Sequence, residues 1–160
     1  MGVGKSTVCE IIKQACPRCV LLDADNLWDT HPFTVTEETK SMVMDNIRHC
    51  LLNFLHCTAI DTIIFCWVMH RQEIIDEIIS FFPKEITEVY RFSLVCSPEA
   101  LRRRLKKDID CGIRQPDVIE RSLRYLPLYA ELDTVAIDVS VIDAKEAAYE
   151  IVRRCFPEEV

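Results

Sequence analysis

Gly2-Val3-Gly4-Lys5-Ser6-Thr7 stands near the start of the sequence, and residues 6–15 continue it with the apolar pattern of a helix. The run matches the latter part of G-x-x-x-x-G-K-[ST], the loop whose backbone N–H groups surround nucleotide phosphates. Glycine lets the backbone approach the phosphates, and the N-terminus of the next helix presents unpaired N–H groups and a positive dipole end. The pattern predicts that these six residues bind a nucleotide.

Two side chains of this loop have separate expected roles. Lys5 would reach the β- and γ-phosphates, and the hydroxyl of Ser6 would ligate Mg²⁺. The alternative is a chance Gly-Lys-Ser-Thr at the head of an amphipathic helix. The helix after the run, and a strand ending in acidic residues after that helix, are the context that the phosphate loop requires.

The front of the loop motif lies outside the sequence. Its first glycine would stand two places before Met1, and the strand that should feed the loop is not there. In this architecture that strand is central, so its loss leaves two neighbours without ladder partners, at about 1–3 kcal/mol for each unmade buried hydrogen bond. We expect a fragment or a start codon assigned too late, preceded in the gene by about five apolar residues and a glycine.

Strand-like and helix-like apolar patterns alternate along the rest of the chain. Strands are expected at residues 18–22, 61–68, 89–96 and 134–139, and helices at 36–57, 70–82, from 97 onward, 117–130 and 143–155. The apolar run at 63–69 is of the kind that parallel strands show when both faces are covered. This alternation with short links predicts an α/β fold, a parallel sheet with helices on both faces, in a single domain over residues 1–160.

Composition narrows the class of protein. A net charge of −7 argues against general nucleic-acid binding, and no apolar run is long enough to span a membrane. The nine cysteines are odd in number and come without a secretory signal, so we expect reduced thiols, several of them on apolar faces (Cys50, Cys66, Cys96), in a cytoplasmic protein. Cys16 and Cys19 suggest a redox or zinc pair, but no second pair accompanies them.

Two carboxylates follow the strand at residues 18–22. Asp23 and Asp25 would lie at the sheet edge where α/β proteins bind ligands. Phosphoryl transfer needs one carboxylate near Mg²⁺ and often another that orients or deprotonates the attacking hydroxyl. The alternative is a solvated turn or an N-cap, because Asp is common in both.

Basic residues concentrate in one segment of an otherwise acidic chain. Eight of the 19 lysines and arginines fall between Arg102 and Arg124. A helix with a solvated basic face explains part of this concentration. A mobile segment that closes over phosphates explains the rest, with the polar, irregular stretch 108–116 as a lid and Gly112 as its hinge.

These motifs resemble the P-loop kinases. The likeness rests on residues 2–7, on Asp-Ala-Asp at 23–25, on Phe-Cys-Trp-Val-Met-His at 65–70, and on the basic stretch 101–108 before Gly-Ile-Arg at 112–114. The group includes shikimate, gluconate and adenylate kinases and chloramphenicol phosphotransferase, and the chain is most similar to bacterial AAA-type ATP-binding proteins within it. The likeness covers nearly the whole chain, although only the phosphate loop is a specific motif.

The resemblance implies a three-layer α/β/α fold with strand order 2-3-1-4-5, the first strand missing here, together with a helical lid over about residues 102–124, ATP and Mg²⁺. It places Asp23 near the metal and Asp25 against the acceptor hydroxyl. It also places Arg104 on the adenine or its phosphates. Asp108 stands where these kinases carry a second arginine, so Arg114 becomes the expected lid contact.

Aromatic and imidazole side chains come from the segments that should line the acceptor pocket. They are Trp28, His31, Phe33, Trp67 and His70. A core position in a buried strand is an equal alternative for Trp67. We therefore expect an ATP-dependent kinase, a monomer or dimer, that phosphorylates a hydroxyl of a small molecule and binds neither nucleic acid nor membrane. The alternatives are a nucleotide-binding regulator or NTPase without an acceptor, and an inactive fragment.

Overall fold

Helices and strands alternate along the chain in the computed structural model, which describes residues 2–85 and 87–157. The strands are β1 (Cys19–Asp23), β2 (Thr62–Cys66), β3 (Phe92–Val95) and β4 (Val135–Asp138). The helices are α1 (Lys5–Ala15), α2 (Glu37–Leu55), α3 (Gln72–Ile79), α4 (Pro98–Asp110), α5 (Val118–Tyr125) and α6 (Ala144–Cys155), with 3-10 helices η1 (Ala24–Trp28) and η2 (Leu126–Glu131).

The strands form two parallel pairs. β1 pairs with β2 so that Asp23 lies opposite Cys66, and β3 pairs with β4 so that Val95 lies opposite Asp138. Across residues 2–85 and 87–157, no strand pairing joins β2 to β3. The expected order 2-3-1-4-5 counts one strand before β1, so β1 and β2 are its strands 2 and 3, and β3 and β4 are its strands 4 and 5. The gap between the two pairs falls where strand 1 is expected. The α/β class and its parallel strands are confirmed.

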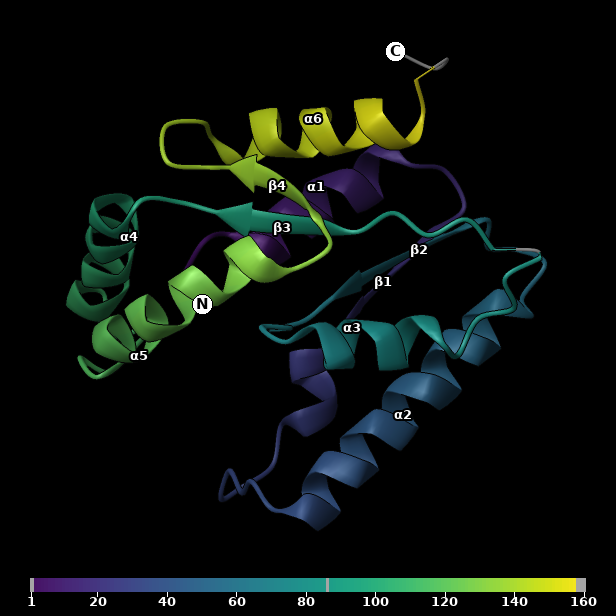
Figure 1. Ribbon diagram of the computed structural model, residues 1–160, viewed down its shortest axis with the longest axis horizontal. Coiled ribbons are helices and arrows are strands. Elements are labelled where there is room, and N and C mark those ends of the chain that lie inside the picture. Colours follow the sequence, from purple (N-terminus) through teal and green to yellow (C-terminus); the bar gives the residue numbers. More distant parts are fainter. Residues whose placement is uncertain (1, 86, 158–160) are drawn as a thin grey trace.

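Helices cover both faces of the strands. In Figure 1, α1 and α6 lie on one side of the strands and α2 and α3 lie on the other. Helix α1 contacts both β1 and β2 and packs along α6, whereas α2 contacts β2. Helices α4 and α5 pack against each other at one end of the molecule. The three layers expected from the sequence are therefore present.

Helix ends follow the signals in the sequence. Thr36 caps α2 and Asp143 caps α6, each in a reciprocal capping box, and Ser97 caps α4 with proline at its first turn. Two expected boundaries are wrong. Helix α4 continues to Asp110, so the irregular stretch is shorter than 108–116. The helix expected at 117–130 is divided into α5 and η2 at Pro127, which has no N–H for an α-helical bond.

Two separate clusters form the hydrophobic core. One joins α1, α4, α5, β4 and α6 around Val8, Leu101 and Leu105, and the other joins β1, α2 and α3 around Ile47 and Leu51. Strand β2 contributes to both, because Ile64 packs against the first cluster while Ile63 and Phe65 pack against the second. Both faces of β2 are covered, as expected.

Strand β2 is nevertheless only partly buried. In this strand only Cys66 is buried, and residues 62–65 are half-buried. The exposure comes from the edge of the strand, not from its two faces, which helices cover. A cavity of about 530 Å³ runs between β2 and β3 and exposes the edge of each.

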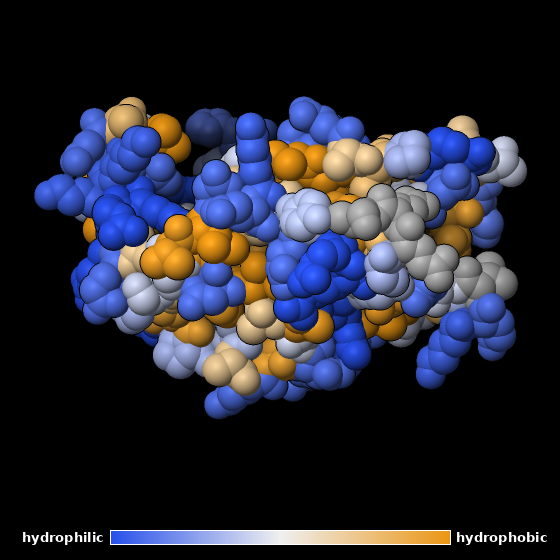
Figure 2. Space-filling view, turned by 90° about the horizontal axis from the view of Figure 1, so that it is seen from above, coloured by the Kyte–Doolittle hydropathy of each residue, from blue (hydrophilic) through white to orange (hydrophobic). Residues whose placement is uncertain are grey.

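The outer surface over α6 is predominantly polar. Seen from that side, blue side chains cover most of the face, with hydrophobic groups between them (Figure 2). On α6 itself, Glu150 forms ion pairs with Arg153 and Arg154 on the exposed side, while Ala147 and Ala148 are buried below. The helix is therefore amphipathic and covers the core with its apolar face.

Candidate functional site

The backbone of residues 2–4 leaves open space in front of α1. Gly2 and Gly4 have φ angles of 78° and 95°, in the left-handed region that favours glycine. A Cβ on Gly2 would come within 2.5 Å of a Leu105 side-chain carbon on α4, whereas a Cβ on Gly4 would meet nothing within 4 Å. Gly2 therefore allows α4 to pack against the loop, and Gly4 faces a space that an anion can enter.

Helix α1 begins directly behind this space. Gly4 is its N-cap, and no described side chain caps the helix there. The first intrahelical bond runs from Val8 N to the Gly4 carbonyl, so the N–H groups of Lys5, Ser6 and Thr7 have no partner within the helix. Three N–H donors at a positive dipole end form an anion-binding geometry.

Ser6 and Asp23 connect the loop to the end of β1. The Ser6 hydroxyl donates a 2.7 Å hydrogen bond to Asp23 Oδ2. The other oxygen of this carboxylate accepts the backbone N–H of Asp25 at 3.2 Å and caps η1. The metal-site and N-cap interpretations of Asp23 are thus compatible, because each uses a different oxygen. Asp25 is exposed on η1, with its side chain on the surface.

Two thiols lie next to the loop, and sequence reasoning did not connect them to it. A hydrogen bond from Cys66 to Cys9 lowers the pKa of the Cys9 thiol and raises that of Cys66, whose pKa burial raises further. The charges of Lys5 and Asp23 act on both thiols. Lys5, Asp23 and this thiol pair therefore share one neighbourhood. The sequence does contain one indication that Cys9 lies near Lys5, because the two residues are four positions, or about one helical turn, apart.

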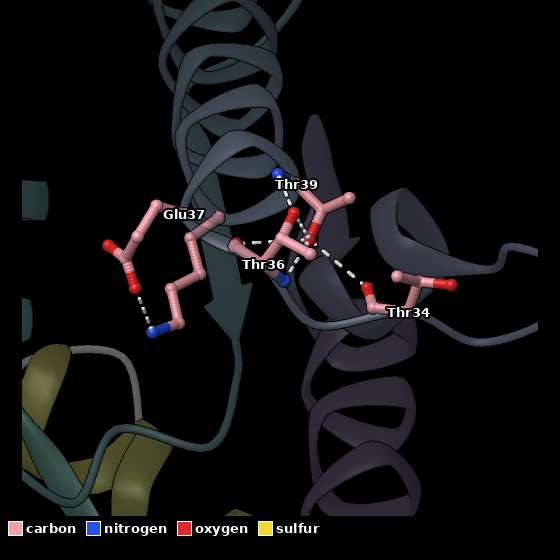
Figure 3. Close-up of polar contacts among 5 residues, drawn as sticks. Thr34, Thr36, Glu37 and Thr39 are labelled. Atoms are coloured by element: carbon pink, nitrogen blue, oxygen red, sulfur yellow. Dashed lines mark hydrogen bonds and ion pairs between the residues drawn. The ribbon is translucent and has the colours of Figure 1, made fainter.

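The segment between η1 and α2 is fixed at both ends. The Thr34 carbonyl accepts hydrogen bonds from Trp28 Nε1 at 3.2 Å and from the Thr39 hydroxyl at 3.0 Å. Figure 3 shows Thr39 between Thr34 and Thr36 at the start of α2, and its hydroxyl also accepts the Thr36 N–H at 2.9 Å. The rings of Trp28 and Phe33 lie 5.8 Å apart, and Phe33 is 67% exposed.

The other expected acceptor residues have different surroundings. Trp67 packs against the core cluster around Ile47 and Leu51, which favours its core interpretation. His31 is exposed. The His70 ring lies 4.5 Å from the Tyr125 ring, and its buried Nδ1 has no hydrogen-bond partner among the described residues. Burial, and secondarily the charge of Arg71, lower the pKa of His70.

Arg104 is tied to the backbone of the loop. Its guanidinium donates to the Val3 carbonyl at 3.4 Å and to the Val139 carbonyl just beyond β4. The resemblance assigned Arg104 to the adenine or its phosphates, but both of these donors are engaged with carbonyls of the protein itself. In the structure Arg104 fastens residues 2–4 to the end of β4.

Arg114 is paired with Asp108 at the end of α4. Its Nε donates to Asp108 Oδ2 at 3.0 Å, and each side chain is about one-third exposed (34% and 32%). Gly112 has φ 72°, and the N–H groups of Gly112 and Ile113 bond to the carbonyls of Ile109 and Asp108. This is a Schellman ending, so Gly112 terminates α4 at the place where the sequence suggested a hinge.

The structure therefore brings Lys5, Ser6, Asp23 and Asp25 to one edge of the strands. Arg104 borders the loop through Val3, and Arg114 is held by Asp108 instead. Within the described ranges, no group of three or more His, Cys, Asp or Glu residues has the arrangement of a metal site, Cys16 and Cys19 included. A hydroxyl and a single carboxylate nevertheless suit Mg²⁺, which keeps several waters and binds through few protein oxygens plus phosphate.

The predicted burial of cysteines on apolar faces is confirmed at two positions. Cys66 and Cys96 are buried free thiols, and Cys50 is a half-buried one. Burial raises the pKa of Cys96, as expected for a thiol in an apolar environment.

Comparisons with known proteins agree on the fold. A family model described as an AAA domain matches residues 1–122. The tunicamycin resistance protein of Deinococcus radiodurans superposes with a TM-score of 0.67 and 16% identity, over 96% of this chain and 90% of that one. A gluconokinase from Sinorhizobium meliloti 1021 gives a TM-score of 0.64 and 18% identity, over 100% of this chain and 93% of that one.

No curated protein sequence matches the chain. In the part of the chain that the structure describes, every helix is too short or too polar to cross a membrane.

Proposed function

Since the chain belongs to the AAA domain family and has a P-loop kinase-like fold, we propose that it is an ATP-dependent phosphotransferase that moves the γ-phosphate to a hydroxyl of a small molecule. The observation that carries this proposal is the hydrogen bond between Ser6 and Asp23, 2.7 Å long. It places a hydroxyl and a carboxylate beside the open space at Gly4, where the N–H donors of α1 converge.

Each residue at this edge then has one task. The N–H groups of residues 5–7 and the Lys5 ammonium hold the phosphates, which positions the γ-phosphate against the acceptor. Ser6 and Asp23 hold Mg²⁺, which when bound neutralises charge on the phosphoryl group. Asp25, exposed on η1, accepts the proton of the acceptor hydroxyl.

The acceptor is expected on the side of Trp28 and Phe33. Their rings contact each other, and the segment that carries Phe33 is fixed to α2 through Thr34. An exposed aromatic side chain on a fixed segment suits a sugar or nucleoside ring. A gluconokinase is among the similar structures, so sugar acids belong in the first panel of acceptors, beside nucleosides and hydroxyl-bearing antibiotics.

Acceptor-dependent release of ADP tests the proposal. We expect ADP from ATP and Mg²⁺ only when a suitable acceptor is present, and loss of both turnover and nucleotide-dependent thermal stabilisation in Lys5→Ala. Lys13→Ala, on the same helix and paired with Glu10 on its surface, is the matched control and should behave as the parent.

Other outcomes decide against the proposal. ADP release at the same rate with and without every acceptor would favour an NTPase, and nucleotide binding without any turnover would favour a regulator. Unchanged ATP binding by Lys5→Ala would overturn the assignment of the phosphate loop itself.

A further inference from the structure

Cys9 and Cys66 are in contact beside the phosphate loop. Cys66 is the last residue of β2 and lies opposite Asp23 in the parallel pairing, and Cys9 belongs to α1, which packs against β2. The Cys66 thiol donates a hydrogen bond to Cys9. Both residues carry free thiols. The fold therefore brings together two reduced cysteines from distant parts of the sequence.

Each thiol is connected to a residue of the candidate site. Cys9 follows Lys5 by four positions on α1, about one helical turn, so both side chains leave the helix on the same face. Cys66 pairs with Asp23, whose carboxylate accepts the Ser6 hydroxyl at 2.7 Å. A change in the separation of the two thiols therefore changes the position of the first turns of α1 relative to the ends of β1 and β2.

The two thiols differ in exposure, which gives each a separate chemical role. Cys9 is half-buried, whereas Cys66 is only 4% exposed. The hydrogen bond from Cys66 lowers the pKa of Cys9, which favours the thiolate, the form that attacks an oxidant. An accessible cysteine beside a second, resolving cysteine is the arrangement found in thiols that sense oxidation. The alternative is a pair of core thiols with a packing role alone, and it predicts no cross-link.

We propose that Cys9 and Cys66 form a reversible disulfide that weakens nucleotide binding at the phosphate loop. Hydrogen peroxide is the oxidant. The Cys9 thiolate attacks one peroxide oxygen, the O–O bond breaks, and Cys9 becomes a sulfenic acid while the departing hydroxide takes up the Cys9 proton as water. The Cys66 sulfur then attacks the Cys9 sulfur, so the S–S bond forms, the S–O bond breaks, and a second water leaves with the Cys66 proton. The two thiols together lose two electrons, and the peroxide gains them.

The disulfide acts on the loop because it draws α1 toward β2. A covalent bond holds the two sulfurs closer together than a hydrogen bond does and fixes their geometry. The N–H groups of residues 5–7, which would surround the phosphates, then leave their positions. A misplacement of about 1 Å can reduce turnover by about 10²-fold where catalysis depends on positioning. This consequence rests on the proposed function, whereas the formation of the disulfide does not.

Peptide mapping by mass spectrometry tests the disulfide directly. The folded chain is treated with a small excess of hydrogen peroxide, the remaining thiols are alkylated, and the peptides are compared before and after reduction. We expect a link between residues 9 and 66 that dithiothreitol reverses. Cys9→Ala and Cys66→Ala should each prevent it. Cys111→Ala, which removes an exposed thiol at the end of α4, is the matched control and should form the link as the parent does.

Two further measurements follow the effect on the loop. Amide hydrogen exchange at residues 8–12 should slow at least about tenfold on oxidation, because the disulfide joins α1 covalently to β2. The Kd for MgATP should rise at least about tenfold on oxidation, return on reduction, and stay constant in Cys9→Ala. By linkage, saturating MgATP should then raise the reduction potential of the pair by about 30 mV, the equivalent of a tenfold change for a two-electron couple.

The proposal is overturned if residues 9 and 66 do not become linked, if other cysteines link in preference, or if the Kd for MgATP is the same in the oxidised and reduced chains. It is also overturned if Cys9→Ala loses MgATP affinity on oxidation as the parent does. A reduced parent that forms the link but binds no MgATP contradicts the proposed function and the effect on nucleotide binding with it. A parent that binds MgATP but forms no link contradicts the disulfide alone.

Discussion

The hydroxyl of Ser6 lies 2.7 Å from Asp23 Oδ2 and donates a hydrogen bond to it, which links the start of α1 to the end of β1. If this pair holds Mg²⁺, Ser6→Ala and Asp23→Asn should each raise the Mg²⁺ concentration needed for half-maximal turnover by about 10–100-fold. Titration of activity with Mg²⁺ measures the effect. Asp45→Asn, at an exposed position on α2, serves as the control. Equal Mg²⁺ dependence in all four proteins would mean that Asp23 only caps η1.

Asp25 has a different expected role, because its side chain is exposed on η1 while its backbone N–H bonds to Asp23. Asp25→Asn should lower turnover by about 10²–10⁴-fold through loss of the general base. ATP affinity and Mg²⁺ dependence should stay near those of the parent. Single-turnover assays beside ATP-binding measurements separate the two effects, and a variant with normal turnover would reduce Asp25 to a surface residue.

Arg114 is expected to neutralise phosphate charge once it leaves Asp108. Arg114→Ala should reduce turnover by about 10²–10⁵-fold. Its stability cost should be about 1 kcal/mol or less, because the ion pair with Asp108 is one-third exposed and screened by solvent. Arg121→Ala, which breaks an exposed pair with Asp117, is the matched control and should retain activity. Normal turnover in Arg114→Ala would exclude a role for this arginine in transfer.

Arg104 should matter for stability as well as for the site. Arg104→Ala removes the donors to the Val3 and Val139 carbonyls and should lower the free energy of unfolding by about 1–3 kcal/mol. Arg103→Ala, at the exposed neighbouring position, should change it by no more than about 0.5 kcal/mol. Urea unfolding measures both values. If the two variants are equally stable, the hydrogen bonds of Arg104 do not stabilise the contact between the loop and the end of β4.

His70 should make the fold sensitive to mild acid. Its pKa is lowered in the folded protein by burial, so between that pKa and the ordinary value near 6.5 the unfolded chain binds a proton that the folded chain does not. Stability should therefore fall as the pH drops below about 6.5. His70→Phe keeps a ring against Tyr125 and should flatten the dependence of the urea midpoint between about pH 7.5 and 5. His31→Phe, at an exposed position, should follow the parent curve.

The sequence predicted the features that have a local cause. The loop glycines, the helix starts at residues 97 and 143, and the apolar runs of β1 and β2 each follow from residues close to one another in the chain. Their positions therefore agree with the structure to within a few residues. The parallel class follows from the alternation of these elements alone.

Features that depend on tertiary contact were beyond a reading of the sequence. Arg104 and Val139 are 35 positions apart in the sequence, and no local pattern around either residue predicts their hydrogen bond. The pairing of Asp108 with Arg114 spans only six positions, yet it depends on the reversal that Gly112 produces after α4. Strand β2 is half-exposed because a cavity lies along its edge, and the apolar composition of the strand does not predict that cavity.

The division of the core into two clusters affects how the chain should unfold. The buried members of one cluster all lie between Leu22 and Ile78, while the other combines Val8 and Ile12 with residues from Cys96 onward. Helix α1 contacts β1 and β2 and packs along α6, and so joins the two halves. With so few elements shared between them, the halves need not melt as one cooperative unit. The segment that carries Asp25 and Trp28 and the segment that carries Arg104 and α6 would then open at different free energies.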